Sequence, residues 1–258
     1  MIVIPMAGQS RRFLDAGYEL PKYMLDVHGR PLFDWVMMSF GHKVATEDFL
    51  FILRDVHGSY EFVKQRFEQL GLKYGKVVVL DSNTGGQADT VQLGLLKAGV
   101  NELEPLVIFN IDTIRPGLDC SSCEGFDGWL EVSSLIGDNW SFVELQKDEP
   151  TLVARCTEKI RISDLCCTGV YQFAGCGVFM DAFRREHHMP SLHELFVAPM
   201  FNHVIADGGR VTIRSVATDR VVTAGVPAEY EELCKSGDTF FRNLEMTYGQ
   251  FLRKGRNA

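Results

Sequence analysis

Three positively charged residues follow the first apolar segment of the sequence at short spacing. The chain begins MIVIPMAGQSRRF and continues with ELPKYML, which places Arg11, Arg12 and Lys22 after the apolar stretch Met1–Met6. Small residues after a strand leave backbone amides free to approach phosphate oxygens, and neighbouring cations favour the same ligand. An anion would also relieve the repulsion between the like charges. These residues predict an anion site, and the alternative is a surface turn with solvated arginines.

Two further loops carry residues suited to a phosphate ester and a metal ion. The segment Asn83–Thr90 reads NTGGQADT and opens a helix-like stretch, where Gly86 lets backbone amides approach an anion at the positive helix end. The segment Leu106–Thr113 reads LVIFNIDT, an apolar strand that leads into Asp112. A carboxylate at the carboxyl end of a strand is a natural Mg²⁺ ligand. The structural alternatives are an ordinary glycine-rich helix start and a turn aspartate.

Alternating strands and helices in the first half of the chain would bring these loops together. We predict strands at Met1–Met6, Phe49–Arg54, Lys76–Leu80 and Leu106–Asn110, and helices at Pro31–Phe40, Tyr60–Leu70 and Gln87–Ala98. Short apolar strands separated by helices indicate a parallel sheet covered on both faces. Ligands of open α/β sheets bind beyond the carboxyl ends of the strands, so the site is expected in the loops Ala7–Lys22, Asp81–Gln87 and Ile111–Gly117.

After Asp112 the pattern changes to consecutive strands joined by turns, which indicates an antiparallel portion. These strands are predicted at Gly128–Leu135, Ser141–Gln146, Leu152–Cys156 and Thr168–Phe173. Helices at Gly177–Arg185 and His193–Ala206, a strand at Arg210–Val216 and a helix from Pro227 to Phe251 complete the prediction. No internal repeat or linker interrupts the chain, so we predict one α/β domain with a mixed sheet.

Composition limits the classes of function. The 258 residues carry a net charge of −8, which disfavours nucleic acid and anionic membranes as partners. No apolar run approaches the roughly 18 residues that span a bilayer, and the first apolar stretch lacks the features of a signal peptide. Seven cysteines, an odd number, are typical of reduced thiols, and the Cys120–Cys123 pair lacks the partners of a zinc site. We expect a cytoplasmic protein without nucleic-acid binding or membrane insertion.

The stretch MAGQSRRFLDAGYELPKYMLDVHGRPLF resembles the N-terminal signature of the nucleotidyltransferases that act on sugar phosphates. That signature reads roughly AGGxGTRL, a variable spacer and PKxMLPVxGKPL. Arg12, Pro21, Lys22 and Gly29 are among the positions that match it. The likeness is closest to a branch found among bacterial capsule and cell-surface polysaccharide proteins.

The resemblance implies a fold and a division of labour along the chain. The fold is a Rossmann-like three-layer α/β/α domain with a mixed, mainly parallel sheet, similar to the GT-A-like nucleotide-diphospho-sugar transferases. Residues 1–258 would form a single domain. Residues 1–117 would be its nucleotide-binding half and residues 118–258 its sugar-phosphate-binding half.

The resemblance also implies roles for the first loop. Ala7, Gly8 and Ser10 would wrap the triphosphate of a nucleotide, with Arg12 on the phosphates and Lys22 near the reacting α-phosphate. Such transfers need charge neutralised on phosphate oxygens and groups held in line, so two cations suit the reaction. The sequence departs from the signature at Ala7 and Ser10, where glycines are usual. A serine resists a backbone with positive φ, so the loop is expected to hold its nucleotide differently.

The same likeness assigns the base and the metal. Gly86 and Gln87 would contact the nucleobase, and a glutamine amide can pair with a pyrimidine edge through its donor and its acceptor. Asp112 would bind Mg²⁺. The sequence does not distinguish cytosine from uracil or thymine.

The second half carries the residues implied for the other substrate. Glu158 would bind hydroxyl groups, Lys159 the phosphate, and Gly169 would permit close approach. Thr223 stands where the family has the aspartate that completes the metal site. Asp219 could compensate, or one carboxylate together with phosphates and waters could suffice.

The implied reaction joins an NTP, with a pyrimidine base favoured, to a sugar or polyol phosphate and releases pyrophosphate. The product would be an NDP- or NMP-linked sugar for surface polysaccharide biosynthesis, and Mg²⁺ the cofactor. A GT-A glycosyltransferase and a non-catalytic nucleotide or sugar-phosphate-binding protein are the alternatives. The sequence is compatible with a homo-oligomer and leaves the oligomeric state open.

The two neighbouring arginines are predicted to be unequal. Arg12→Ala should largely abolish turnover, whereas Arg11→Ala should be mild, because only Arg12 falls on the signature. Pyrophosphate release by both variants measures the difference. Equal effects would show that the loop does not align with the signature.

Overall fold

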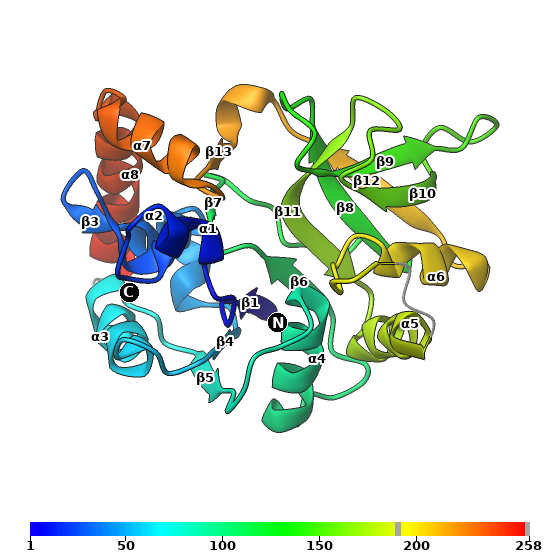
Figure 1. Ribbon diagram of the computed structural model, residues 1–258, viewed down its shortest axis with the longest axis horizontal. Coiled ribbons are helices and arrows are strands. Elements are labelled where there is room, and N and C mark those ends of the chain that lie inside the picture. Colours follow the sequence, from blue (N-terminus) through cyan, green and yellow to red (C-terminus); the bar gives the residue numbers. More distant parts are fainter. Residues whose placement is uncertain (189–191, 256–258) are drawn as a thin grey trace.

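A nine-stranded mixed sheet runs through the computed structural model, which describes residues 1–188 and 192–255 (Figure 1). Its strands are β1 (Ile2–Pro5), β4 (Phe49–Leu53), β5 (Gly75–Val79), β6 (Leu106–Phe109), β8 (Gly128–Ser133), β9 (Ser141–Leu145), β10 (Val153–Glu158), β11 (Cys166–Phe173) and β12 (Val211–Ser215). Seven of them follow the order β10-β9-β11-β6-β1-β4-β5, and β8 joins β11 to β12 beside this path.

The strand order reverses at β1. Strands β4 and β6 flank β1 and run parallel to it, and β5 continues the sheet beyond β4. The chain therefore builds outward from β1 to β4 and β5, and then returns to place β6 on the other side of β1. In open α/β sheets such a reversal leaves a crevice at the carboxyl ends of the two strands, where ligands bind.

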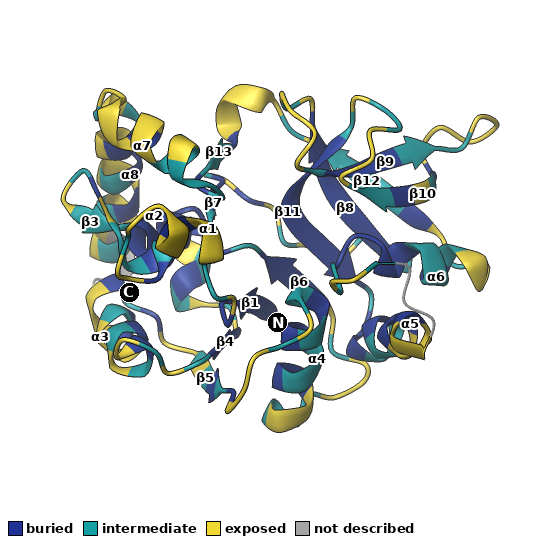
Figure 2. Ribbon diagram, viewed as in Figure 1, coloured by how far each residue is buried: buried dark blue, intermediate teal, exposed yellow. Residues whose placement is uncertain are grey.

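Strand β11 connects the two halves of the sheet. It runs antiparallel to β6, with Val170 opposite Phe109, and also pairs with β8 and β9. Figure 2 shows β8 and β11 buried along their whole length. Because β11 is antiparallel to β6, the beginning of β11 lies at the carboxyl end of β6.

Helices cover both faces of the sheet. Helices α2 (Leu32–Met38), α3 (Ser59–Leu70) and α8 (Thr239–Gly255) pack on one face, and α4 (Gln87–Ala98), α5 (Cys176–His188) and α6 (Met200–Ala206) on the other. Alternate strand residues serve the two cores, since Ile2 and Ile4 belong to the first and Val3 to the second. The predicted three-layer α/β/α architecture with a mixed, mostly parallel sheet is confirmed.

Short elements connect the long strands and helices. They are α1 (Arg11–Asp15), η1 (Lys22–Met24), β2 (Asp26–Val27), β3 (Arg30–Pro31), η2 (Gly41–Ala45), β7 (Thr113–Ile114), η3 (Thr218–Arg220), β13 (Val222–Thr223) and α7 (Pro227–Lys235). Strand β13 pairs with β7 and so brings the C-terminal part of the chain beside the loop that follows β6. Among the described residues, no helix is long and apolar enough to cross a membrane.

Three element predictions were wrong in part. The predicted helix His193–Ala206 begins only at Met200, because Leu195 pairs through its backbone with Gly85 and Ala88. The Leu195 amide donates to the Gly85 carbonyl at 2.9 Å and its carbonyl accepts from the Ala88 amide at 2.8 Å, which requires a non-helical segment.

The other two differences are a break and an addition. The predicted helix Pro227–Phe251 is divided into α7 and α8, because Ser236 takes an extended conformation at the end of α7. The loop predicted between Ala7 and Lys22 contains the single helical turn α1.

Candidate active site

A cavity of about 700 Å³ lies over the carboxyl ends of β1 and β6. Every residue to which the resemblance assigned a role lines it, namely Ala7, Gly8, Ser10, Arg12, Lys22, Gly86, Gln87, Asp112, Glu158, Lys159 and Gly169. Arg11 lines it as well. The fold thus gathers the predicted residues, which span more than half of the chain, around one space.

The loop after β1 takes a conformation unusual for its sequence. Ser10 has φ 50° and ψ 34°, in the left-handed region that the sequence argued against for a serine. From there its carbonyl accepts from the amides of Phe13 and Leu14 at 2.8 and 3.1 Å, which starts helix α1. The Arg54 side chain donates to the Ala7 carbonyl at 3.1 Å and anchors the beginning of the loop.

The two arginines of this loop contribute uncompensated positive charge. Both Arg11 and Arg12 are exposed, and Arg11 donates to the Gln9 amide oxygen at 2.7 Å. No ion pair to either guanidinium occurs within residues 1–188 and 192–255. An anionic ligand in the cavity would meet these charges without first displacing a carboxylate.

A lysine and an aspartate meet at the centre of the cavity wall. The Lys22 ammonium contacts the Asp112 carboxylate, and each side chain is 20% exposed. Pro21, which is buried, fixes the backbone just before Lys22. The Asp112 carbonyl accepts from the Ala224 amide at 2.9 Å, so the β7–β13 pairing holds the aspartate in place.

The loop before α4 packs against a distant backbone. Gly86 has φ 147°, and a Cβ atom there would lie 2.5 Å from the backbone of Leu195, so only glycine fits. The Gln87 amide donates to the Asn110 side-chain oxygen, which orients both groups at the cavity wall. One donor of Gln87 is therefore engaged within the protein, and the rest of the amide lines the cavity.

Asn110 and Gly169 form a close contact between the two halves of the sheet. The backbone amide of Asn110 donates to the backbone carbonyl of Gly169 at 2.9 Å. Gly169 has φ +91°, and a Cβ atom would lie 2.6–2.9 Å from the Asn110 side chain. Glycine is required here both by backbone conformation and by the space that Asn110 fills.

A buried polar network lies behind this contact. Glu131 accepts from the Arg115 guanidinium at 2.9 Å and from the Thr168 hydroxyl at 2.9 Å. The Arg115 amide donates to the Ser39 hydroxyl at 2.8 Å, and Thr113 bonds to the Thr168 carbonyl at 3.2 Å. The network joins the end of α2 to β7, β8 and β11, and it fixes the backbone after Asp112 and before Gly169.

The opposite part of the cavity carries an acid and a base that are adjacent in sequence. The Glu158 side chain is only 7% exposed, contacts the Ser141 hydroxyl and lies 3.6 Å from the Lys159 ammonium. Burial raises the pKa of the Glu158 carboxyl, although Ser141 and Lys159 act in the other direction. Lys159 has φ 56°, and its ammonium lies 4.5 Å from the centre of the Phe196 ring.

Several cavity residues escaped the sequence analysis. They include Trp140, Ser141, Tyr171, Glu194 and Phe196. The sequence signal for them is weak. They come from the start of β9, from the interior of β11 and from a non-helical segment, and the approach of these segments to the cavity depends on long-range pairing.

The carboxylate near Asp112 is not the one the sequence suggested. Thr223 lines the cavity on β13, whereas Asp219 is exposed on η3 and is not among the lining residues. Glu229 on α7 does line it and accepts from the Gly225 amide at 2.8 Å. A Cβ atom on Gly225 would lie 3.5 Å from the Asp112 carboxylate and 3.5 Å from the Glu229 carboxylate.

The donors available to a metal are therefore carboxylate oxygens. Asp112 and Glu229 both lie close to Gly225, and oxygen donors suit Mg²⁺. Within the part of the chain that the structure describes, no group of three or more His, Cys, Asp or Glu side chains could hold a metal ion, Cys120 and Cys123 included. Two carboxylates with ligand phosphates fit Mg²⁺, which is bound through one or two carboxylates in many phosphate sites.

Solved structures provide close comparisons. The chain is similar to a nucleoside-diphosphate-sugar pyrophosphorylase from Vibrio cholerae RC9, with 40% identity, coverage of 92% of this chain and 100% of that chain, and a TM-score of 0.86. It is also similar to an inositol-1-phosphate CTP transferase from T. maritima, with 17% identity, 91% and 94% coverage and a TM-score of 0.70.

An apo UDP-glucose pyrophosphorylase shares 13% identity, with 94% and 98% coverage and a TM-score of 0.70. At such identities these last two structures show a shared fold alone. No protein-family model matches the sequence, and no match was found among curated proteins.

The Gly169 contact can be tested against a matched glycine. Gly169→Ala and Gly208→Ala both place a Cβ at a left-handed position, with φ +91° and +83°, but only Gly169 meets a neighbour there. Each should lose about 1–2 kcal/mol of stability from backbone strain. Gly169→Ala should in addition abolish the rise in melting temperature that an NTP produces, because Asn110 and Gln87 are displaced. Equal NTP-induced shifts in the two variants would contradict the role given to this contact.

Proposed function

The chain belongs to the family of sugar-phosphate nucleotidyltransferases, and from this premise we propose that it joins an NTP to a sugar or polyol phosphate with release of pyrophosphate. The observation that carries the proposal is that one cavity holds two groups of positive charge. The Arg11–Arg12 loop and Lys22 lie on the nucleotide side, and Lys159 lies on the side built by β10 and β11. A reaction between two phosphate compounds needs a cationic site for each.

The proposed reaction requires little covalent chemistry from the protein. A phosphate oxygen of the second substrate attacks the α-phosphorus of the NTP, a new P–O bond forms, and the bond from the α-phosphorus to the bridging oxygen breaks. Pyrophosphate takes the electron pair of that bond. Negative charge accumulates on the phosphate oxygens, and Arg12 and Lys22 are positioned to stabilise it.

Asp112 and Glu229 would hold Mg²⁺ in this reaction. When bound, the ion supplies positive charge that neutralises phosphate oxygens. Glu229 supports the proposal because it places a second carboxylate near Asp112 although Thr223 cannot provide one. The Lys22 ammonium balances the charge of Asp112 within the protein itself.

The proposal also assigns residues to the base of the NTP and to the second substrate. Gly86 and Gln87 are proposed to contact a pyrimidine base, and the free donor and acceptor of the Gln87 amide suit such an edge. Glu158, largely buried and hydrogen-bonded to Ser141, would accept from hydroxyl groups of the sugar or polyol. We place the product in surface polysaccharide biosynthesis in the cytoplasm, on the resemblance of the N-terminal signature.

An activity screen tests the proposed reaction. The protein, incubated with Mg²⁺, each of the four NTPs and a panel of sugar and polyol phosphates, should release pyrophosphate with at least one pair, and a pyrimidine NTP should be preferred. Use of a preformed nucleotide sugar in place of an NTP would favour a glycosyltransferase. Tight NTP binding without turnover across the panel would favour a non-catalytic binding protein, and both outcomes would refute the proposal.

The assignment of Glu229 can be tested by metal binding as well as by turnover. Glu229→Gln keeps an acceptor for the Gly225 amide, so the start of α7 should be preserved. In the presence of NTP, the affinity for Mn²⁺ measured by electron paramagnetic resonance should fall at least about tenfold.

Two further variants complete that test. Glu232→Gln, on an exposed position of α7, should bind Mn²⁺ like the wild type. Adding Thr223→Asp to Glu229→Gln should restore affinity, because it returns a carboxylate to the cavity. If Glu229→Gln bound Mn²⁺ as tightly as the wild type, the role of Glu229 would be limited to accepting from the Gly225 amide at the start of α7.

A further inference from the structure

Two loops at the outer end of the cavity carry side chains that face the second substrate. Residues 134–140 connect β8 to β9, and residues 159–165 connect β10 to β11. The first loop brings Asn139 and Trp140 to the cavity, and the second begins with Lys159. Neither loop has regular structure of its own, so its position depends on contacts between the loops.

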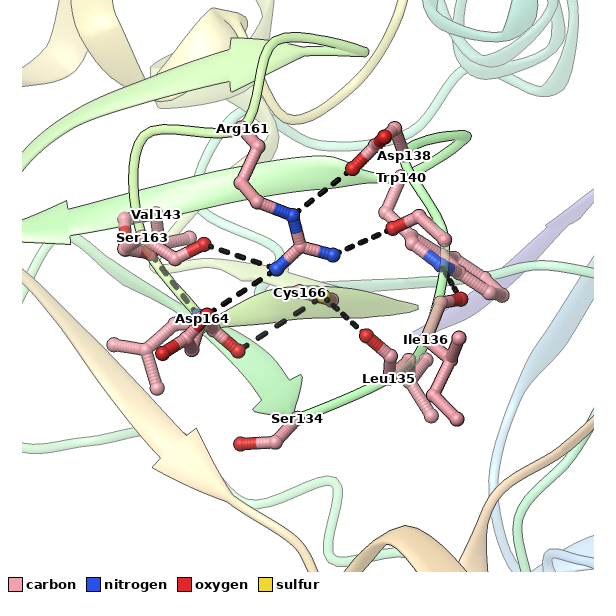
Figure 3. Close-up of polar contacts among 12 residues, drawn as sticks. Ser134, Leu135, Ile136, Asp138, Trp140, Val143, Arg161, Ser163, Asp164 and Cys166 are labelled. Carbon is pink, nitrogen blue, oxygen red and sulfur yellow. Dashed lines mark hydrogen bonds and ion pairs between the residues drawn. The ribbon is translucent and has the colours of Figure 1, made fainter.

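Arg161 supplies most of those contacts (Figure 3). Its guanidinium donates to the Asp138 carboxylate at 2.9 Å and to the Gly137 carbonyl at 2.7 Å, both in the first loop. It also donates to the Asp164 carboxylate at 3.3 Å and to the Ser163 carbonyl at 3.5 Å in its own loop. One planar group thus reaches four acceptors in two loops.

The Arg161 guanidinium also packs over a buried aromatic ring. It lies 4.8 Å from the centre of the Phe142 ring, and Phe142 is fully buried in β9. The Cys166 thiol contacts the Leu135 carbonyl at 3.5 Å, which holds the first loop at its other end (Figure 3). Arg161 is therefore held in one plane and can position the loops that it bonds.

The loops joined by Arg161 meet again at the cavity. The Lys159 amide donates to the Trp140 carbonyl at 2.9 Å, and the Ser141 hydroxyl contacts the Glu158 carboxylate. Lys159 is in the left-handed conformation with φ 56°, which is unfavourable for a lysine and persists only when its surroundings impose it. Lys159 bonds to Trp140, the Thr157 hydroxyl donates to the Ile160 carbonyl at 2.6 Å across it, and Arg161 anchors the chain that follows.

We propose that Arg161 is a positioning residue for the second substrate: it joins residues 134–140 to residues 159–165 and so keeps Glu158 and Lys159 directed into the cavity. The proposal rests on the proposed function, since it names the part of the site that serves the sugar or polyol phosphate. The Arg161 side chain is 36% exposed, but its guanidinium meets four acceptors and the buried Phe142 ring, which an isolated surface charge would not do. The guanidinium acts through the loops and does not line the cavity.

The test compares Arg161→Ala and Arg161→Lys with a matched control. Arg155→Ala removes an exposed arginine of the same sheet edge, which pairs with Glu144 at 2.6 Å and lies outside the cavity. With the pair of substrates found in the activity screen, Arg161→Ala should raise the KM for the sugar or polyol phosphate about tenfold. The KM for the NTP should stay within about twofold. Arg161→Lys should recover part of the loss, because an ammonium can reach one acceptor group but not all four.

A second readout separates this proposal from the proposed function. Hydrogen exchange of the backbone amides in residues 134–140 should become faster in Arg161→Ala and remain unchanged in Arg155→Ala, whether or not the wild type turns over any substrate. Unchanged exchange in Arg161→Ala would overturn the inference, and so would an equal rise of KM for both substrates. Absence of turnover in the wild type with faster loop exchange in Arg161→Ala would refute the proposed function alone.

Discussion

The contact between Asn110 and Gly169 determines how the rest of the structure is arranged. It lies where the parallel strand β6 ends, beside the middle of the antiparallel strand β11, with the Asn110 backbone amide bonded to the Gly169 carbonyl. Because a side chain at position 169 would occupy the space of Asn110, the two backbones can approach each other only with glycine there. The two halves of the sheet therefore meet at the carboxyl end of β6, and the cavity opens above this junction.

The charges in the cavity are organised by that arrangement. Lys22 and Asp112 neutralise each other at the end of β6, while Arg11 and Arg12 have no acidic partner among the described residues. On the other side, Glu158 is buried beside Lys159 and its pKa is raised by the loss of water. The net charge of the protein is −8, so the positive charge of Arg11 and Arg12 is local. A cavity with local positive charge can attract an anionic ligand although the protein as a whole is acidic.

The proposed metal site and the two loops joined by Arg161 illustrate how one position compensates for another. Thr223 occupies a position where a carboxylate was expected, and Glu229, six residues later, faces Asp112 from the first turn of α7. Arg161 has a comparable role away from the reacting groups, since its guanidinium bonds to both irregular loops and holds them together. In the first case a side chain from another element supplies the missing carboxylate. In the second a side chain supplies the contacts between two loops without regular structure.

The sequence alone determined the α/β class, most strands and helices of the first half, and part of the set of residues that surrounds the cavity. Periodicity and a contiguous signature are local properties, so Gln87–Ala98 was predicted with its observed bounds. The segment 193–199 was wrongly predicted as helix because its backbone bonds go to Gly85 and Ala88, more than 100 residues away in sequence.

Glu229, Ser141, Phe196 and the contacts of Arg161 could not be predicted for the same reason. Whether these side chains reach the cavity or contact one another depends on which strands are neighbours. Strand order is set by long-range pairing, which no local sequence pattern contains. The left-handed Ser10 likewise contradicts its own propensity, because the helix turn that it starts and the anchored loop before it outweigh the local cost. Local chemistry thus decided which residues are suited to the site, and the tertiary structure decided which of them meet.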